Sequence, residues 1–290
     1  MDISVRPLTP AVGAEIAGMD LADISNAEFE QIAGAWHQYS ALLFRGQRLS
    51  DDDLLSFSRR FGELDPPPIQ EHGRLSPPGY PEIYVVSNVV DEKGQPLGAL
   101  GAGEAVWHTD MSYLELPPDA AMLYALEVPL EGGNTSICGM QAAWSSLPDN
   151  LKARVRDCRI KHDGTYNSGG YLRQGVEATD DPHKAPGAWH PAVCRHPASG
   201  APMLYLGRRR NSCIEGLSPA QSEILLDALW AHIDRPELRY VHKWRVGDLL
   251  LWDNRSTMHR REPFDAKARR IMHRTQIKGA HRPQPYLASA

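Results

Sequence analysis

Short segments of β-type sequence recur along most of this chain, and they do not alternate with helices in the regular manner of a parallel α/β fold. The segments are rich in β-branched and aromatic residues and are bounded by turn-forming residues. They cover residues 41–44, 82–86, 121–126, 134–137, 203–206, 249–252 and 271–277. Many strands without βαβ alternation favour two facing sheets. We therefore predict a mainly β protein with flanking helices, a double-stranded β-helix or jelly roll.

Helical patterns are expected to flank these sheets. They cover residues 26–36, 51–61, 141–155 and 219–233. Ser25 and Ser50 are suitable N-caps for the first two helices, because a serine hydroxyl accepts a hydrogen bond from the first turn. Pro148 interrupts the third helix, and Pro219 suits the first position of the last.

Two long loops separate the regular segments. One is the Pro-rich stretch 65–79, and the other is the stretch 167–187, rich in Gly, Asp and Pro. Loops of this length often cover an active site, so we predict that both border one. No repeat, low-complexity tract or break in composition marks a linker. Residues 1–290 are therefore expected to form a single domain.

Charge and composition restrict the partners. A formal net charge of −5 provides no basic surface for nucleic acid or for an anionic membrane. No apolar run reaches the roughly 18 residues of a membrane span. The four cysteines form no C-x-x-C pair, which indicates reduced thiols rather than a zinc knuckle. We expect a cytoplasmic protein whose partner is a small molecule, without nucleic acid or membrane.

His108 and Asp110 are the first candidate metal ligands, in the sequence Trp-His-Thr-Asp-Met. In a strand the side chains of residues i and i+2 project to the same side, so both could bind one ion. A hydrogen-bonded His–carboxylate pair on a surface turn explains the same pattern. The pair alone therefore leaves both interpretations open.

A third candidate ligand, His259, follows a buried strand about 150 residues further on. Two histidines and one carboxylate leave coordination positions open, an arrangement that suits oxygen activation by iron(II) with a bidentate co-substrate. Zinc could use the same ligands. However, the H-E-x-x-H motif is absent, and no further carboxylate is assigned to activate a zinc-bound water.

Arg270 and Arg274 lie on the last predicted strand, where a spacing of four puts them on one face. A guanidinium that faces the core is costly unless it meets an anion, and its planar fork matches a carboxylate. Two solvated arginines on an exposed sheet face are the alternative.

Together these blocks resemble the taurine/2,4-dichlorophenoxyacetate dioxygenase (TauD/TfdA) family of Fe(II)- and 2-oxoglutarate-dependent oxygenases. The resemblance rests on the order and spacing of residues 107–110, 132–135, 252–255, 258–259 and 270–274. It implies a dioxygenase that uses Fe(2+), 2-oxoglutarate and O2 to hydroxylate a small anionic organic substrate, with release of succinate and CO2.

The resemblance also implies roles for individual residues. His108, Asp110 and His259 would bind the iron. Arg270, eleven residues beyond the last ligand, would pair with the distal carboxylate of 2-oxoglutarate, and Thr135 would donate a hydrogen bond to it. Arg274 would bind the anionic group of the substrate or the near carboxylate of the co-substrate.

Three positions bear on the identity of the substrate. Family members that act on taurine have a histidine, a tyrosine and an asparagine at positions that fall on Pro67, Gln70 and Glu104 here, so taurine is disfavoured. Gln70 and Glu104 are predicted to border the substrate, although a shift in the Pro-rich loop would bring in His72. An aryloxyalkanoate, a sulfonate or a related acid is expected.

A basic run, Arg208-Arg209-Arg210, adds a further candidate. Strand alternation would put Arg208 and Arg210 on one face and Arg209 on the other. Arg210 is predicted to contact an anionic substrate, and a solvated basic turn is the alternative.

Two other functions remain open on the residues alone. One is a zinc-dependent hydrolase, and the other is a non-catalytic ligand-binding jelly roll. A homo-oligomer, a dimer or a tetramer, is expected for an enzyme of this kind.

Overall fold

The computed structural model describes residues 3–67, 76–103, 105–179 and 181–287 and contains two facing antiparallel-rich sheets. The larger sheet has eight strands in the order β1-β2-β3-β14-β7-β16-β4-β5, and the smaller has four in the order β13-β8-β15-β6. The strands of the larger sheet are β1 (Ser4–Pro7), β2 (Ala14–Ala17), β3 (Ala41–Phe44), β4 (Tyr84–Ser87), β5 (Ala99–Leu100), β7 (Ala120–Glu127), β14 (Leu249–Asp253) and β16 (Ile271–Ile277). Those of the smaller sheet are β6 (Ala105–His108), β8 (Thr135–Gly139), β13 (Arg239–His242) and β15 (Thr257–Arg261).

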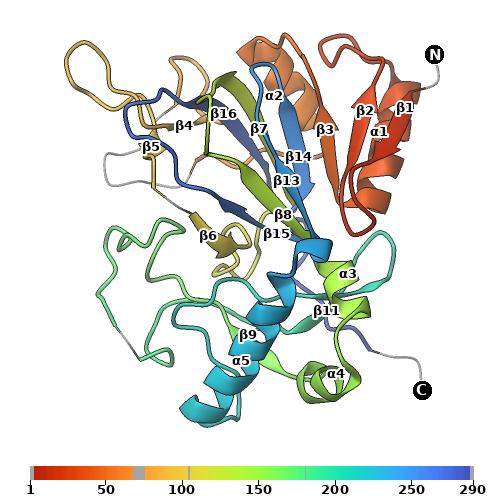
Figure 1. The fold of residues 1–290 in the computed structure, drawn as a ribbon, viewed down its shortest axis with the longest axis vertical. Coiled ribbons are helices and arrows are strands. Elements are labelled where there is room, and N and C mark those ends of the chain that lie inside the picture. Colours follow the sequence, from red (N-terminus) through yellow and green to blue (C-terminus); the bar gives the residue numbers. More distant parts are fainter. Residues whose placement is uncertain (1–2, 68–75, 104, 180, 288–290) are drawn as a thin grey trace.

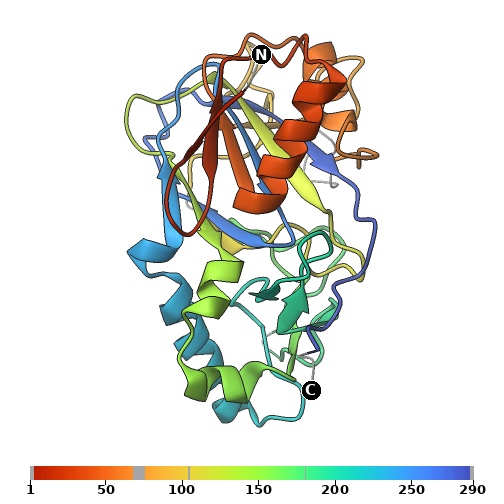
Figure 2. The ribbon, with the colours of Figure 1, turned by 90° about the vertical axis from the view of Figure 1, so that its right-hand side faces the viewer.

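Helices and two small sheets surround this pair. The helices are α1 (Asn26–Tyr39), α2 (Asp51–Arg59), α3 (Met140–Ser145), α4 (Asp149–Val155), α5 (Pro219–Ile233) and a 3-10 turn (Pro236–Leu238). The small sheets pair β9 (Arg159–Lys161) with β10 (Trp189–Pro191) and β11 (Val193–Arg195) with β12 (Pro202–Leu204). In Figure 1 the two main sheets lie in the upper half, and α3, α4 and α5 lie below them. The view turned by 90° shows the same division (Figure 2).

Strand alternation divides the core into three apolar clusters. On β14, Leu249 and Leu251 face a cluster shared with α1 and α2, whereas Leu250 and Trp252 face the space between the sheets. The smaller sheet alternates in the same way, since Met258 of β15 packs toward α5 while its neighbour His259 points to the opposite face. The jelly roll thus has helices outside both sheets and its functional residues between them, as the sequence predicts.

The helix starts follow from local sequence. Ser25, Ser50 and Ser218 each form a capping box with the residue three positions on, which satisfies amide groups of the first turn. Pro219 occupies the first turn of α5, and Pro148 separates α3 from α4. These elements confirm the predicted helices, although α1 continues three residues beyond the expected end.

Two predicted strand placements are wrong. β6 ends at His108, so Asp110 lies in the turn that follows rather than on the strand. Residues 206–211 form no strand: only Arg208 makes an isolated bridge and a bend and turn follow it, because Gly207 has a φ of 72° and Asn211 a φ of 53°. Among the described residues, no helix combines the length and apolar character needed to cross a membrane.

Candidate metal and co-substrate site

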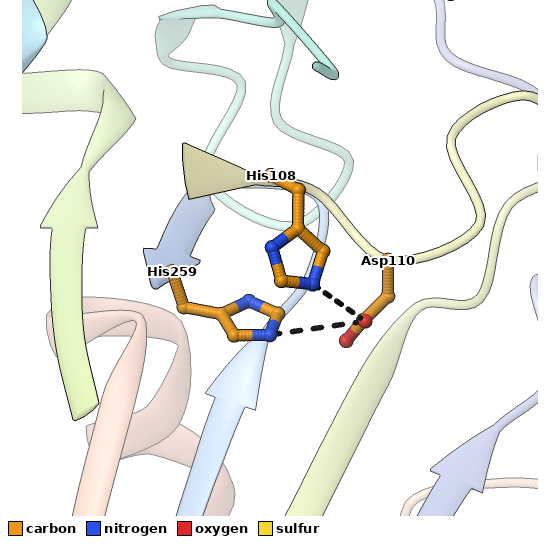
Figure 3. A group of neighbouring side chains, drawn as sticks. All are labelled: His108, Asp110 and His259. Carbon is orange, nitrogen blue, oxygen red and sulfur yellow. Dashed lines mark ion pairs between the residues drawn. The ribbon is translucent and has the colours of Figure 1, made fainter. Parts of the chain in front are cut away.

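His108 and His259 face each other across two neighbouring strands of the smaller sheet. They are directly paired in the register of β6 and β15, although about 150 residues separate them in the chain. Both side chains point to the inner face, and Asp110 approaches them from the turn after β6 (Figure 3). Antiparallel pairing alone therefore brings the two imidazoles together.

The three side chains have the spacing of a metal site. His108 Nε2 lies 3.5 Å and His259 Nε2 lies 3.8 Å from Asp110 Oδ1. One ligand atom from each residue lies within 4.8 Å of the others, and all three residues are buried. Although β6 ends at His108, the turn that follows it places Asp110 next to both histidines.

Hydrogen bonds hold these ligands in place. His108 Nδ1 donates to the carbonyl of Val106 at 2.7 Å, which leaves Nε2 unprotonated in the neutral ring. Asn254 accepts from the amide of Asp110 at 2.8 Å, and its Nδ2 donates to the carbonyls of Asp110 and Pro118. The Asn254 amide therefore joins the metal turn to the end of β14.

Electrostatics favour the protonation states that bind a cation. Burial lowers the pKa of His108 and lowers the pKa of His259 to about 3. Burial alone would raise the pKa of Asp110, but Arg274 and the two histidines hold that pKa well below its ordinary value. Neutral imidazoles and an ionised carboxylate are the forms that bind a metal.

Arg270 lies beside these ligands, fully buried. Its relative exposure is 1%, and its Nε has no hydrogen-bond partner in the described part of the chain. Burial, and then the charge of Arg261, lower its pKa to about 9. Arg270 lines a cavity of about 60 Å³ together with His108 and His259. An unpaired buried guanidinium facing a cavity requires an anion there.

Thr135 and Arg274 line the same cavity. The hydroxyl of Thr135 accepts from Trp244 Nε1 at 3.0 Å, so its own hydrogen is available for a ligand. Arg274 Nη2 forms an ion pair with Asp110 Oδ2 at 2.6 Å and donates to Gln276 Oε1 at 3.1 Å. The structure thus places Arg270 and Arg274 toward one cavity, while His273 between them contacts Asp51 of α2 on the opposite face.

The basic run at 208–210 is arranged differently from the prediction. Arg208 is buried and lines a second cavity beside His108. Arg209 pairs with Glu223 and Asp227 of α5. Arg210 is exposed and lies over the ring of Tyr166 at 3.3 Å, so it does not line either cavity. The turn, rather than strand alternation, determines these three directions.

Gln70, His72 and Glu104 lie outside the described residues. Pro67 is described and buried.

Four residues in or beside the site were not predicted from the sequence: Asn254, Trp244, Arg261 and Arg173. Arg261 lies two residues beyond His259 on β15, so alternation was a usable signal for it. Its Nη2 donates to the carbonyl of Leu100 at 2.9 Å and to that of Gly103. Arg173 lies in the irregular loop 167–187, where no periodicity predicts a direction.

Known proteins resemble this chain over nearly its whole length. The model of a family described as "Taurine catabolism dioxygenase TauD, TfdA family" matches residues 4–276. The chain is 34% identical over 282 residues to the alpha-ketoglutarate-dependent 2,4-dichlorophenoxyacetate dioxygenase of Cupriavidus pinatubonensis, covering 94% of this chain and 97% of that protein. It is 32% identical over 288 residues to the (S)-phenoxypropionate/alpha-ketoglutarate-dioxygenase of Sphingobium herbicidovorans, covering 95% and 94%.

A solved structure agrees with these similarities. The crystal structure of AAD-2 in complex with Mn(II) and N-oxalylglycine matches with a TM-score of 0.79 at 28% identity, covering 98% of this chain and 100% of that chain. The similarity extends through both sheets and their helices.

Proposed function

The chain belongs to the TauD/TfdA family of dioxygenases, and on that premise we propose that it uses iron(II) and molecular oxygen to hydroxylate a small anionic organic acid. It is a 2-oxoglutarate-dependent dioxygenase. Because members of this family are dioxygenases, membership argues against a zinc-dependent hydrolase and against a non-catalytic ligand-binding jelly roll. The observation that carries the proposal is the buried, unpaired guanidinium of Arg270 beside a His–Asp–His cluster.

The donor set fits iron(II). His108, Asp110 and His259 provide two imidazoles and one carboxylate, the combination found in non-haem iron oxygenases. Because His108 Nδ1 donates a hydrogen bond to the carbonyl of Val106, the ring presents Nε2 toward the cluster. When bound, iron(II) supplies the position at which 2-oxoglutarate and oxygen react, with succinate and carbon dioxide as co-products.

The residues around the cluster fit 2-oxoglutarate. Arg270 supplies a planar fork for the distal carboxylate, and Thr135 supplies a hydroxyl hydrogen whose direction is set by Trp244. N-oxalylglycine, held with Mn(II) in the AAD-2 structure, has the same chain of atoms with one methylene replaced by NH. Arg274 is proposed to bind the near carboxylate of 2-oxoglutarate or the anionic group of the substrate, since its guanidinium contacts the ligand Asp110.

The remaining lining residues position the reactants and exclude water. Val86, Leu123 and Trp252 give the cavity an apolar wall between the sheets. In that surrounding the charged contacts are stronger than in water. An acid such as an aryloxyalkanoate or a sulfonate is the proposed substrate, supported by the phenoxyalkanoate dioxygenases among the relatives.

Location and assembly complete the proposal. All four cysteines are free thiols, which supports a reducing, cytoplasmic location. A homo-oligomer and a single domain over residues 1–290 remain predictions, and light scattering after size exclusion would test the former.

Anaerobic reconstitution tests the function. Iron(II) with 2-oxoglutarate should give a weak visible charge-transfer band, and aerobic turnover should form succinate. His108→Ala should lose both, whereas His281→Ala, at an exposed position that lines neither cavity, should keep both. Activity that needs neither 2-oxoglutarate nor oxygen would contradict the proposal.

A further inference from the structure

A second cavity of about 50 Å³ adjoins the first on the His108 side. Leu100, Ser168, His108 and Arg274 line both cavities. Three arginines, Arg173, Arg208 and Arg274, line the second one, and they come from three separate segments of the chain. Such a concentration of positive charge beside a metal site is costly unless anions compensate it.

The backbone of Arg208 pairs with the segment that carries His108. Gly207 accepts through its carbonyl from the amide of Thr109 at 3.1 Å, so the backbone of the arginine runs alongside that of His108. The Arg208 side chain is 6% exposed. One of its terminal nitrogens donates to the carbonyl of Tyr166, and its Nε has no partner in the residues described.

Arg173 approaches the cavity from the long loop. Its guanidinium lies 4.1 Å from the ring centroid of Tyr113, and its backbone amide donates to Thr165 at 2.9 Å. Its Nε is buried and has no partner over the described ranges. The loop therefore presents a second guanidinium with an unused donor.

The charges of these arginines are unequally compensated. Arg274 is paired with Asp110. Neither Arg173 nor Arg208 has a carboxylate within salt-bridge distance among residues 3–67, 76–103, 105–179 and 181–287. Burial and then the neighbouring Arg173 lower the pKa of Arg208 to about 10, although Asp163 opposes this. Among the described residues that line this cavity, guanidinium groups therefore outnumber carboxylates.

We propose that Arg208 and Arg173 form the anion subsite for the primary substrate, and that this subsite selects a carboxylate. The inference rests on the proposed function and deepens it. A planar carboxylate matches the fork of a guanidinium, and a cavity of about 50 Å³ suits a small head group. A carboxylate held there lies beside His108 and Asp110, which places the adjoining carbon near the metal position.

The test compares Arg208→Gln with Arg209→Gln, a matched control whose side chain pairs with α5. The probes are phenoxyacetate, 2-phenoxypropionate and an aliphatic carboxylate, each with its uncharged carboxamide, and an alkanesulfonate and an alkyl sulfate of similar size. Succinate formation gives kcat and KM for each. Wild type and Arg209→Gln should prefer the best acid over its amide.

In Arg208→Gln the KM for the acid should rise by about tenfold or more, the scale for a lost charge-assisted hydrogen bond, while the KM for the amide changes little. Arg173→Gln should act in the same direction. Arg208→Lys retains the charge but lacks the planar fork of donors, so its KM for the acid should lie between those of wild type and Arg208→Gln. The anaerobic iron(II)–2-oxoglutarate band should persist in all variants, which shows that they fold and bind co-substrate.

Three results would overturn the inference. One is an unchanged preference for acid over amide in Arg208→Gln. Another is loss of 2-oxoglutarate binding in that variant, which would assign Arg208 to the co-substrate. The third is that no carboxylate probe stimulates succinate formation, or that only the sulfonate or the sulfate does. A wild-type protein without the band would instead refute the proposed function.

Discussion

Replacing Arg270 by methionine should stabilise the protein without ligands and abolish its stabilisation by 2-oxoglutarate. The pKa of Arg270 falls from 12.5 to about 9, which is equivalent to about 5 kcal/mol of destabilisation of the charged form. Relaxation reduces such penalties, and apolar replacements of buried ions typically stabilise by about 1–4 kcal/mol. We expect Arg270→Met to raise the free energy of unfolding at pH 7 by that amount.

The sign of the pH dependence follows from the lowered pKa of a cation. Below the folded pKa of about 9 the penalty is fully present, and it decreases progressively as the pH rises from that value toward the ordinary pKa of 12.5. The advantage of Arg270→Met should therefore shrink between pH 7 and pH 10. Urea unfolding of the metal-free proteins at both pH values measures the difference in free energy of unfolding between Arg270→Met and wild type.

Addition of Mn(II) and 2-oxoglutarate should reduce or reverse the advantage of Arg270→Met. At about 100 times the dissociation constant, the ligand should stabilise wild type by about 2.7 kcal/mol, and Arg270→Met at the same concentration by far less. Arg269→Met, at an exposed residue paired with Glu127, should match wild type throughout. A ligand-free Arg270→Met protein that is less stable than wild type, or whose advantage is independent of pH, would refute the reasoning.

Three further variants test the supports of the site. Asn254→Ala removes the hydrogen bonds to the metal turn and should weaken Mn(II) affinity by about 10–100-fold, measured by calorimetric titration; unchanged affinity would contradict that role. Trp244→Phe removes the donor to Thr135 and should raise the KM for 2-oxoglutarate by about fivefold in the succinate assay, with kcat less affected. Gly207→Ala should cost about 3 kcal/mol or more in urea unfolding, because φ is 72° and the new Cβ would lie 2.1 Å from His162 Nδ1; a wild-type midpoint would disprove that crowding.

The sequence by itself determined the features that depend on local pattern. Capping serines and prolines located the helix starts, and apolar alternation identified most strands, because these signals act over a few residues. Spacing and residue type also selected His108, Asp110 and His259, which the structure brings within 4.8 Å. The role of Arg270 came from the family resemblance, through its position eleven residues beyond the last ligand, because the strand pattern alone left a solvated arginine as the alternative.

Only the tertiary structure decided which charged side chains share a cavity. Pairing of β6 with β15 brings together residues about 150 positions apart, and no local signal specifies that pairing. In the run 208–210, a left-handed glycine turns the chain so that Arg208 enters the cavity and Arg210 stays outside. Arg173 reaches the same cavity from a loop without periodicity. Side-chain direction in turns and loops depends on contacts made by the folded chain, so sequence alternation could not assign it.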